Sequence, residues 1–439
     1  MPSLRRNIVY QFLYELLIVF IPLFTIPYVS RVLGAENIGL FSYTYAVANY
    51  FVLFANLGIK NYGSRTIAMV RNNKEELNRN FSEILSIHII FSIIVIFVYL
   101  VLLFFFVEDN LVIFLIQSIY VFAAVFDINW FFFGIEKFKL TVGRNTLVKI
   151  LSVFLVLVFV KTQTDLWIYA LILALSVFVG QSVVWFALKQ YVSWRRPSWA
   201  NMKQHIRPLF VLFLPILALS LYKYMDKIML GSISSNVQVG FYENAEKIIN
   251  VPMSLIMAFG VVLMPRIANM VTSKDKGEVF KLIDMSMEAV MLLAIAISFG
   301  LAGISFVLAP IFFGYEFEEC GILIMGLAVT VPFMAFANVI RTQYLIPYKE
   351  DKIFVVSLFL GAAVNLIVNI ILIPYMAARG AVIGTIFAEI IVCIYQSYFV
   401  RKKIFIKKQV VSAASYLCDP TNGYDHIFAF YDQQCIVKI

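Results

Sequence analysis

The sequence Tyr28-Val-Ser-Arg-Val-Leu-Gly34 is followed by Gly39 and, 26 residues later, by Arg65-Thr-Ile-Ala-Met-Val70. The same pattern returns as Met225-Asp-Lys-Ile-Met-Leu-Gly231, Gly240 and Arg266-Ile-Ala-Asn-Met-Val271. Gly39 to Gly240 and Arg65 to Arg266 have the same offset of 201 residues. Both copies lie in strongly apolar surroundings, which predicts a membrane protein with two matching halves. Two similar lobes can rock about a site held between them, so the repeat favours an alternating-access transporter.

The composition predicts an all-α integral membrane protein. The chain has 439 residues, of which 62% are hydrophobic and 14% charged, and its mean hydropathy is +0.88. A helix needs about 20 apolar residues to cross a bilayer core of roughly 30 Å. The long apolar runs are continuous and not alternating, which indicates helices. Twelve such runs are found, at 8–30, 38–58, 81–107, 111–133, 143–160, 166–188, 208–230, 243–265, 284–312, 320–341, 353–374 and 380–400.

Six of these helices fall in residues 1–200 and six in 201–408, so each half is expected to form one lobe. An even number of helices keeps the two repeats parallel, which predicts a pseudo-two-fold axis along the membrane normal. The connecting segment, 191–205, is polar and basic. Residues 409–439 are polar and rich in turn formers, and they are expected to form a disordered cytoplasmic tail.

The basic residues predict the orientation of the chain. Twenty-eight Lys and Arg residues lie in the segments that are cytoplasmic if the N-terminus is inside, and four lie in the outer loops. This asymmetry places both termini in the cytoplasm. The net charge of +9 is therefore explained by topology and by attraction to anionic lipids, and it does not indicate nucleic-acid binding.

Motifs of an enzyme are missing from the sequence. It contains no Gly-x-x-x-x-Gly-Lys-Ser/Thr, no Gly-x-Ser-x-Gly and no His-Glu-x-x-His, and its cysteines and histidines have no metal-ligand spacing. We therefore expect no catalytic residues, no cofactor and no metal. Transport would draw its energy from an ion gradient or from the membrane potential.

Three charged residues lie within the seventh predicted span. Lys223, Asp226 and Lys227 are spaced by three and four positions, which places them on one helix face. Two cations beside one carboxylate can hold a phosphate and couple its release to protonation of Asp226. The alternative is that these side chains lie near the helix end and extend to the interface. Arg31 lies at a similar depth in the matching lobe, which favours a cavity.

Further cations lie near helix ends. Lys247 opens the eighth predicted span, where an interfacial position is as plausible as a substrate contact. Arg65, Arg266 and Arg341 lie at inner helix ends, where the positive-inside rule already explains them. The equal positions of Arg65 and Arg266 in the two repeats favour a paired role, as an inner gate or as a receiver of an anionic head group.

Glu389 lies near the middle of the last span, in Gly384-Thr-Ile-Phe-Ala-Glu-Ile. A lone carboxyl group at that depth is a candidate carrier of a coupling proton. The alternative is a buried, protonated glutamic acid that is hydrogen-bonded by a neighbouring helix. Asn365 and Asn369, four positions apart on the eleventh span, are the candidate partners.

Several of these segments resemble the polysaccharide-biosynthesis oligosaccharide flippases of the Wzx type, which belong to the multidrug/oligosaccharidyl-lipid/polysaccharide exporter superfamily. The similarity extends over nearly all of residues 5–405. The segments that carry it are Pro27–Gly39, Gly58-Ile-Lys-Asn-Tyr-Gly63, Met225–Gly231, Val239–Lys247, Leu263-Met-Pro-Arg266, Asn365–Pro374 and Gly380-Ala-Val-Ile-Gly-Thr385.

The resemblance implies a fold with two six-helix lobes and a substrate, an undecaprenyl-pyrophosphate-linked oligosaccharide that moves from the inner to the outer leaflet of the bacterial cytoplasmic membrane. It implies a cavity lined by basic side chains, at Arg31, Lys223 and Lys227 and also at Arg65, Arg266 and Arg341. Implied partners are membrane lipids and the polysaccharide polymerase and glycosyltransferases of the same pathway. Many relatives have a thirteenth and a fourteenth helix. This chain departs from that pattern after about residue 408, which suggests a truncation or a frameshift.

Two alternatives remain within the superfamily. A flippase for another lipid-linked precursor, of cell wall or teichoic acid, has the same requirements. A drug/cation antiporter would need an acidic, aromatic cavity, and Arg31, Lys223 and Lys227 argue against it. A membrane enzyme such as a polymerase would need a large outer loop or an acidic metal motif, and the sequence has neither.

Overall fold

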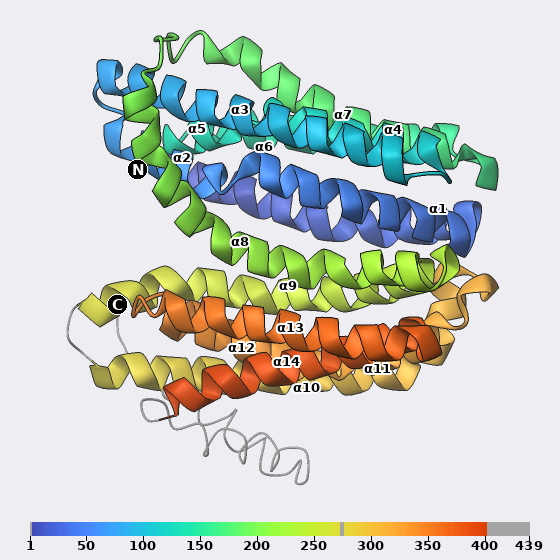
Figure 1. Ribbon diagram of the computed structural model, residues 1–439. Coiled ribbons are helices and arrows are strands. Elements are labelled where there is room, and N and C mark those ends of the chain that lie inside the picture. The colour runs from blue at the N-terminus through green and yellow to red at the C-terminus, as the bar shows by residue number, and fades with distance from the viewer. Residues whose placement is uncertain (1, 273–275, 402–439) are drawn as a thin grey trace. The chain divides into compact units, whose positions relative to one another are not determined.

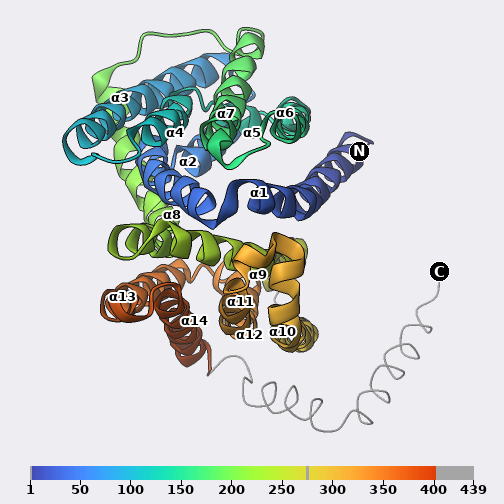
Figure 2. The same cartoon turned by 90° about the vertical axis from the view of Figure 1, so that its right-hand side faces the viewer.

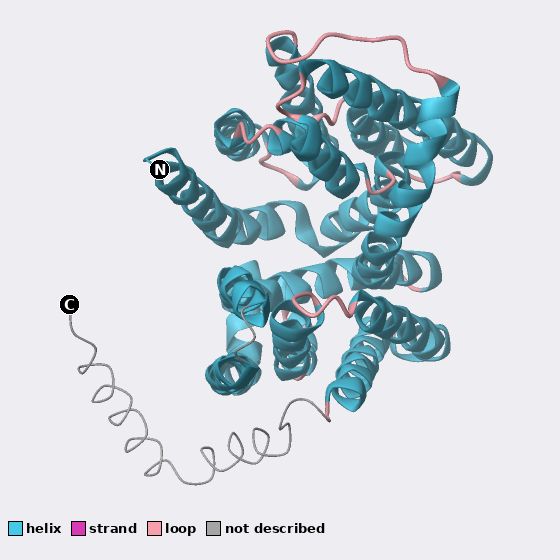
Figure 3. Cartoon of the chain, turned by 90° about the vertical axis from the view of Figure 1, so that its left-hand side faces the viewer, coloured by secondary structure: helices cyan, strands magenta, loops and turns pink. Residues whose placement is uncertain are grey.

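The computed structural model describes residues 2–272 and 276–401, which form helices joined by short connections (Figures 1 and 3). The helices, in chain order, are α1 (Pro2–Asn56), α2 (Ile59–Val70), α3 (Lys74–Phe106), α4 (Leu111–Val125), α5 (Asn129–Gly134), α6 (Phe138–Phe159), η1 (Gln163–Asp165), α7 (Leu166–Leu188), α8 (Trp199–Ile233), α9 (Asn236–Thr272), α10 (Lys276–Phe313), η2 (Tyr315–Phe317), α11 (Cys320–Ala328), α12 (Thr330–Val339), η3 (Ile340–Leu345), α13 (Asp351–Met376) and α14 (Ala378–Val400). The predicted tail, 409–439, lies outside the described residues.

The all-α, multi-pass membrane architecture predicted from the sequence is confirmed. Eleven helical stretches of the described chain are long and apolar enough to cross a membrane, and the first of them is Leu23–Val70. α1 has 55 residues, which at about 1.5 Å per residue is far longer than one crossing of a bilayer. Gly34, with φ 77° and ψ 172°, interrupts it. The first two predicted spans are therefore the two parts of α1, and the loop predicted between them is a break at one glycine.

One predicted helix beginning is wrong. α9 begins at Asn236, so Lys247 does not open a helix but lies about three turns inside one. The helix tolerates charges there because they form ion pairs, as described below. The predicted span 320–341 is confirmed as one apolar stretch, Cys320–Leu345, which consists of α11, α12 and the π-helical turn η3.

Contacts divide the chain into two compact units. The first unit contains the described residues up to Lys247 together with Ser305–Leu323 and Asn365–Gly384, and the second contains Ile248–Ile304, Ile324–Val364 and the described residues from Thr385 onward. The expected lobes, 1–200 and 201–408, stay a prediction.

In the first unit, α1 packs against α3, α4, α6 and α8, and α4 packs against α7 (Figure 2). α2 and α5 approach each other closely at two glycines. A Cβ on Gly63 would come within 2.6 Å of the Trp130 ring, and one on Gly134 within 2.6 Å of Ile67. Trp130 is buried together with Phe81 and two further aromatic residues, Phe131 and Phe132. These small-to-large contacts hold the helices together where lipid offers no hydrophobic driving force.

Candidate functional site

The two repeat glycines lie against each other in the first unit. A Cβ added to Gly39 would come within 1.6 Å of the Asn236 carbonyl oxygen, and one added to Gly240 within 2.0 Å of the Ala35 carbonyl oxygen. Ala35 and Asn236 are themselves 201 residues apart. α1 and α9 therefore approach to backbone contact, which only glycine permits at these positions.

A second pair of contacts joins α1 to α8 and α9. Asn244 Nδ2 donates a hydrogen bond of 2.9 Å to Ser30 Oγ, and a Cβ on Gly231 would come within 2.3 Å of the Tyr43 ring. Tyr43 and Asn244 are equivalent in the repeat, as are Ser30 and Gly231, because each pair is 201 residues apart. Equivalent residues thus exchange partners, which is the contact pattern that a two-fold axis produces.

A compact ion-pair cluster lies next to this contact, on α8 and α9. The Lys227 ammonium is 2.5 Å from a Glu243 oxygen and 2.8 Å from a Glu246 oxygen, and Lys247 is 3.1 Å from Glu243. The side chain of Lys227 is only 8% exposed. Two cations therefore face two carboxylates in a partly buried cluster, in which Lys227 is the most enclosed member and depends most on its partners.

Asp226 lies beside this cluster but has a different set of partners. Its carboxylate is buried and accepts hydrogen bonds from Tyr242 Oη, at 2.6 Å, and from Asn369 Nδ2, at 2.5 Å. Asn369 also donates to Asn365 Oδ1, at 3.1 Å. Asn369 was predicted to be a partner of Glu389, and in the structure its amide group donates a hydrogen bond to Asp226. A carboxyl group with this polar surrounding can accept a proton or a small cation without losing all its contacts.

Arg31 and Lys223 are exposed cations of the same unit. Arg31 is part of α1, three residues before the break at Gly34, and it donates a hydrogen bond of 2.6 Å to the Ile311 carbonyl oxygen. The Lys223 ammonium is 5.4 Å from the centre of the Tyr224 ring. Both side chains therefore keep donor capacity for an anion.

A pocket in the first unit lies between α1, α6 and α7 and reaches Lys247. Most of its wall is apolar, and its polar groups are hydroxyls in addition to the Lys247 ammonium. The wall is formed by Thr25, Ile26, Val29, Ser30, Ile38, Phe41, Ser42, Val153, Val156, Tyr169, Leu173 and Lys247. A mostly apolar wall with a few placed polar groups is typical of a small-molecule pocket, and hydroxyls and an ammonium group can hydrogen-bond a sugar or a phosphate ester.

The remaining predicted site residues are divided between the two units. Arg65 is exposed on α2 in the first unit. Arg266, Arg341 and Glu389 belong to the second unit. Arg266 is exposed on α9, and Glu389 is buried on α14. Arg341 lies in the π-helical turn η3, half-buried, with its guanidinium 5.4 Å from the centre of the Phe354 ring.

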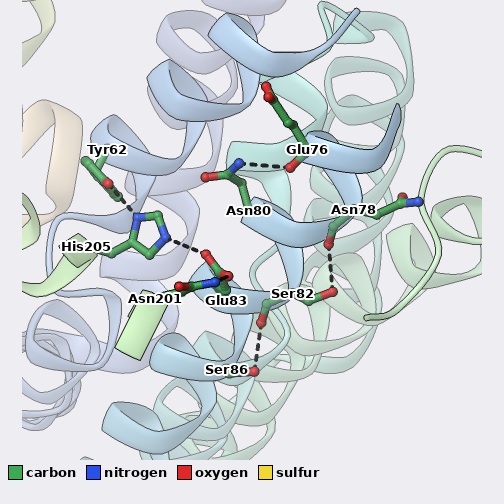
Figure 4. Close-up of polar contacts among 9 residues, drawn as sticks. All are labelled: Tyr62, Glu76, Asn78, Asn80, Ser82, Glu83, Ser86, Asn201 and His205. Atoms are coloured by element: carbon green, nitrogen blue, oxygen red, sulfur yellow. Dashed lines mark hydrogen bonds and ion pairs between the residues drawn. The ribbon is translucent and has the colours of Figure 1, made fainter. Parts of the chain in front are cut away.

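One polar cluster was missed by the sequence analysis (Figure 4). His205 Nε2 is 2.9 Å from Glu83 Oε2, and the two side chains are 3% and 2% exposed. Tyr62 Oη lies 2.6 Å from His205 Nδ1, and Asn201 Nδ2 donates to Glu83 Oε1 at 3.0 Å. Glu83 and His205 are 122 residues apart in sequence, so no spacing rule connects them.

Comparison with known proteins gives a consistent set of similarities. Residues 4–271 match the family model described as "Polysaccharide biosynthesis protein". A protein of Shigella dysenteriae named "Putative O-antigen transporter" is 24% identical over 407 residues, which cover 89% of this chain and 98% of that protein. A protein of Escherichia coli strain K12 with the same name is 26% identical and covers 91% and 97%. Among solved structures, "Lipid II flippase MurJ, inward closed conformation" has a TM-score of 0.72 at 15% identity, covering 99% of this chain and 93% of that one.

Proposed function

This chain belongs to the polysaccharide biosynthesis protein family, and we propose that it is a flippase for lipid-linked oligosaccharide repeat units. The observation that carries the proposal is the similarity to the two proteins named as O-antigen transporters, which extends over 98% and 97% of their lengths. The likeness to the lipid II flippase, at 15% identity, supports the fold alone.

The physical chemistry of such a substrate explains why a protein is needed. A repeat unit exposes many hydroxyls, and each one moved into hydrocarbon without a partner costs on the order of a few kcal/mol. A polar path across the bilayer removes that barrier, while the lipid tail stays among the other acyl chains. We propose undecaprenyl pyrophosphate as the lipid carrier, because a pyrophosphate requires cations along the path.

We assign the substrate contacts to basic residues, of which four lie in the first unit near or beside the ion-pair cluster and three lie elsewhere on the chain. Arg31 and Lys223 are exposed, so their donors could bind an anion, and Lys247 reaches a pocket whose other polar groups are hydroxyls. Lys227 is held by Glu243 and Glu246. Protonation of one of these carboxylates would release it toward a phosphate. Arg65, Arg266 and Arg341 are proposed to receive the pyrophosphate at the cytoplasmic side.

Asp226 and Glu389 are the proposed ion-coupling groups. Both are buried carboxyl groups in membrane helices, and such groups are rarely retained without a function. Asp226 touches Tyr242 and Asn369, so a change in its charge would alter contacts among three helices. An ion gradient or the membrane potential, worth about 2.3 kcal/mol per charge per 100 mV, would then drive export.

The proposed location is the bacterial cytoplasmic membrane with both termini in the cytoplasm, as the distribution of Lys and Arg predicts. The pathway's glycosyltransferases, which make the substrate, and its polymerase, which consumes the flipped product, are the proposed protein partners.

Complementation tests the proposed function. The chain is expressed in a bacterium that lacks its own repeat-unit flippase, and surface polysaccharide and accumulated lipid-linked repeat units are measured. We expect surface polymer to return, to be lost with Arg31→Ala and to be partly kept with Arg31→Lys. Lys349→Ala removes an exposed cation of the second unit and is the matched control. Failure of rescue across strains with different repeat units, despite membrane insertion, contradicts the proposal.

A further inference from the structure

The segment that joins α7 to α8 is fastened to the first unit. We call this segment together with the first turns of α8, residues 189–207, the strap. The Ser193 amide donates to Asn78 Oδ1 at 2.9 Å, and the Arg195 amide donates to Ser82 Oγ at 2.9 Å. Both acceptors lie on α3, and the strap runs past the beginning of that helix (Figures 1 and 4). The sequence predicted only a polar linker here, whereas the structure gives it a fixed inner face.

The end of the strap that enters α8 is fastened more strongly. Asn201 and His205 both bind the buried carboxylate of Glu83, and Tyr62 binds the other nitrogen of His205 (Figure 4). The Glu83 carboxylate therefore has its hydrogen-bond partners inside the first unit. The opposite face of the strap is held in a defined position, although it makes none of these contacts.

This outer face is basic and aromatic. Residues 189–207 contain no Asp or Glu, and Trp194 and Trp199 are 54% and 59% exposed. Within the described residues, no carboxylate forms an ion pair with the strap's exposed cations. These cations are Lys189, Arg195, Arg196, Lys203 and Arg207.

The strap joins the ends of two candidate membrane spans, where lipid headgroups are expected. The candidate span before it ends at Leu188, and the next one begins at Trp199, within the strap, so the strap lies where two candidate membrane crossings end. Tryptophan side chains favour this boundary between hydrocarbon and water. Arginine and lysine side chains beside them reach the headgroup phosphates, and anionic lipids attract such clusters.

We propose that the outer face of the strap is a binding surface for anionic phospholipid headgroups. The cations supply the charge complementarity, the two tryptophans enter the interface, and the Glu83–His205 contact holds both in place from behind. This binding is separate from the proposed flippase activity, because it needs no substrate and no transport. It would anchor this end of the first unit to one leaflet.

Fluorescence quenching tests the proposal on the full chain in nanodiscs of phosphatidylcholine and phosphatidylglycerol. One of the two lipids is brominated at a time, at equal mole fraction. We expect brominated phosphatidylglycerol to quench more than brominated phosphatidylcholine, and the excess to vanish in Trp194→Phe/Trp199→Phe. Arg195→Ala/Arg196→Ala keeps both tryptophans and the Arg195 amide, and it should weaken the preference for the anionic lipid by on the order of tenfold.

Lys349→Ala/Lys352→Ala is the charge-matched control, because it removes two exposed cations elsewhere on the chain. It should leave the preference unchanged. Equal quenching by both brominated lipids, or an excess that survives in Arg195→Ala/Arg196→Ala, overturns the proposal. The proposal is also overturned if neither brominated lipid quenches Trp194 or Trp199, and that result would favour a protein partner for this face.

Discussion

Gly39 and Gly240 hold the same place in the two halves of the sequence repeat, and they touch each other in the folded chain. A Cβ on Gly39 would come 2.7 Å from the Gly240 nitrogen, and one on Gly240 would come 3.2 Å from the Gly39 nitrogen. When two equivalent residues of a repeat meet, the simplest operator that relates the repeats is a two-fold axis between them. The exchange of partners between Ser30–Asn244 and Gly231–Tyr43 agrees with that operator.

The first prediction concerns this contact. Gly39→Ala and Gly240→Ala should each lower the melting temperature and abolish export, because the new methyl group meets a backbone carbonyl at 1.6 or 2.0 Å. A backbone carbonyl cannot change rotamer as a flexible side chain can, so the two helices must move apart. This should lower the free energy of unfolding by about 1–3 kcal/mol or more. Thermal unfolding of the purified chain and the complementation assay measure the two effects.

Gly143→Ala and Gly300→Ala are the controls, because nothing lies within 4 Å of a Cβ at either position. Alanine in a helix interior is more favourable than glycine by up to about 1 kcal/mol, so these variants should melt at the same temperature or higher. If Gly39→Ala melts as the controls do, the close contact between α1 and α9 is not present in solution.

The second prediction concerns Lys227. Lys227→Ala removes the cation that Glu243 and Glu246 share and leaves only Lys247, which pairs with Glu243, so the loss of stability should reach about 3–5 kcal/mol. Lys227→Met combined with Glu243→Gln and Glu246→Gln removes all three charges and should recover most of the melting temperature. Export should stay absent in the triple variant, because the releasable cation is gone. Recovered export would show that the cluster serves stability alone.

The sequence predicted the helices well because a bilayer restricts the choice so strongly. Continuous apolar runs can only be spans, and the 201-residue offset of Gly39 and Gly240 already relates the two halves. Helix ends were predicted less well. The rule that charges mark a helix end placed Lys247 at the beginning of a helix, whereas an ion pair with Glu243, one turn earlier on the same helix, lets it lie inside α9.

The contacts of the site depend on distances in space that the sequence does not encode locally. Lys227 was predicted as a phosphate ligand from its helix face, and the carboxylates that hold it come from the following helix. Asn369 was predicted beside Glu389, although its amide binds Asp226, 143 residues away. Glu83 and His205 gave no signal at all, because a buried pair of this kind is set by how α3 and α8 pack.

The third prediction concerns ion coupling at Asp226. Asp226→Asn removes the charge but can still accept from Asn369 and donate to Tyr242, so the melting temperature should stay near that of the parent. Export in membrane vesicles should lose its dependence on an imposed proton or sodium gradient. Tyr242→Phe is the companion variant, since it keeps the carboxylate and should keep the gradient dependence. An unchanged gradient response in Asp226→Asn excludes this residue and leaves Glu389, tested by Glu389→Gln, as the candidate.

The fourth prediction concerns the attachment of the strap. His205→Ala removes one hydrogen-bond partner of the Glu83 carboxylate, which is 2% exposed, and a buried acceptor left unsatisfied costs about 1–3 kcal/mol. Hydrogen exchange should accelerate at the Ser193 and Arg195 amides, which are bonded to α3. His205→Gln can still donate to Glu83 and accept from Tyr62, so it should retain most of the protection. If His205→Ala exchanges as slowly as the parent, the strap is held by its backbone contacts to α3 and not by the Glu83–His205 pair.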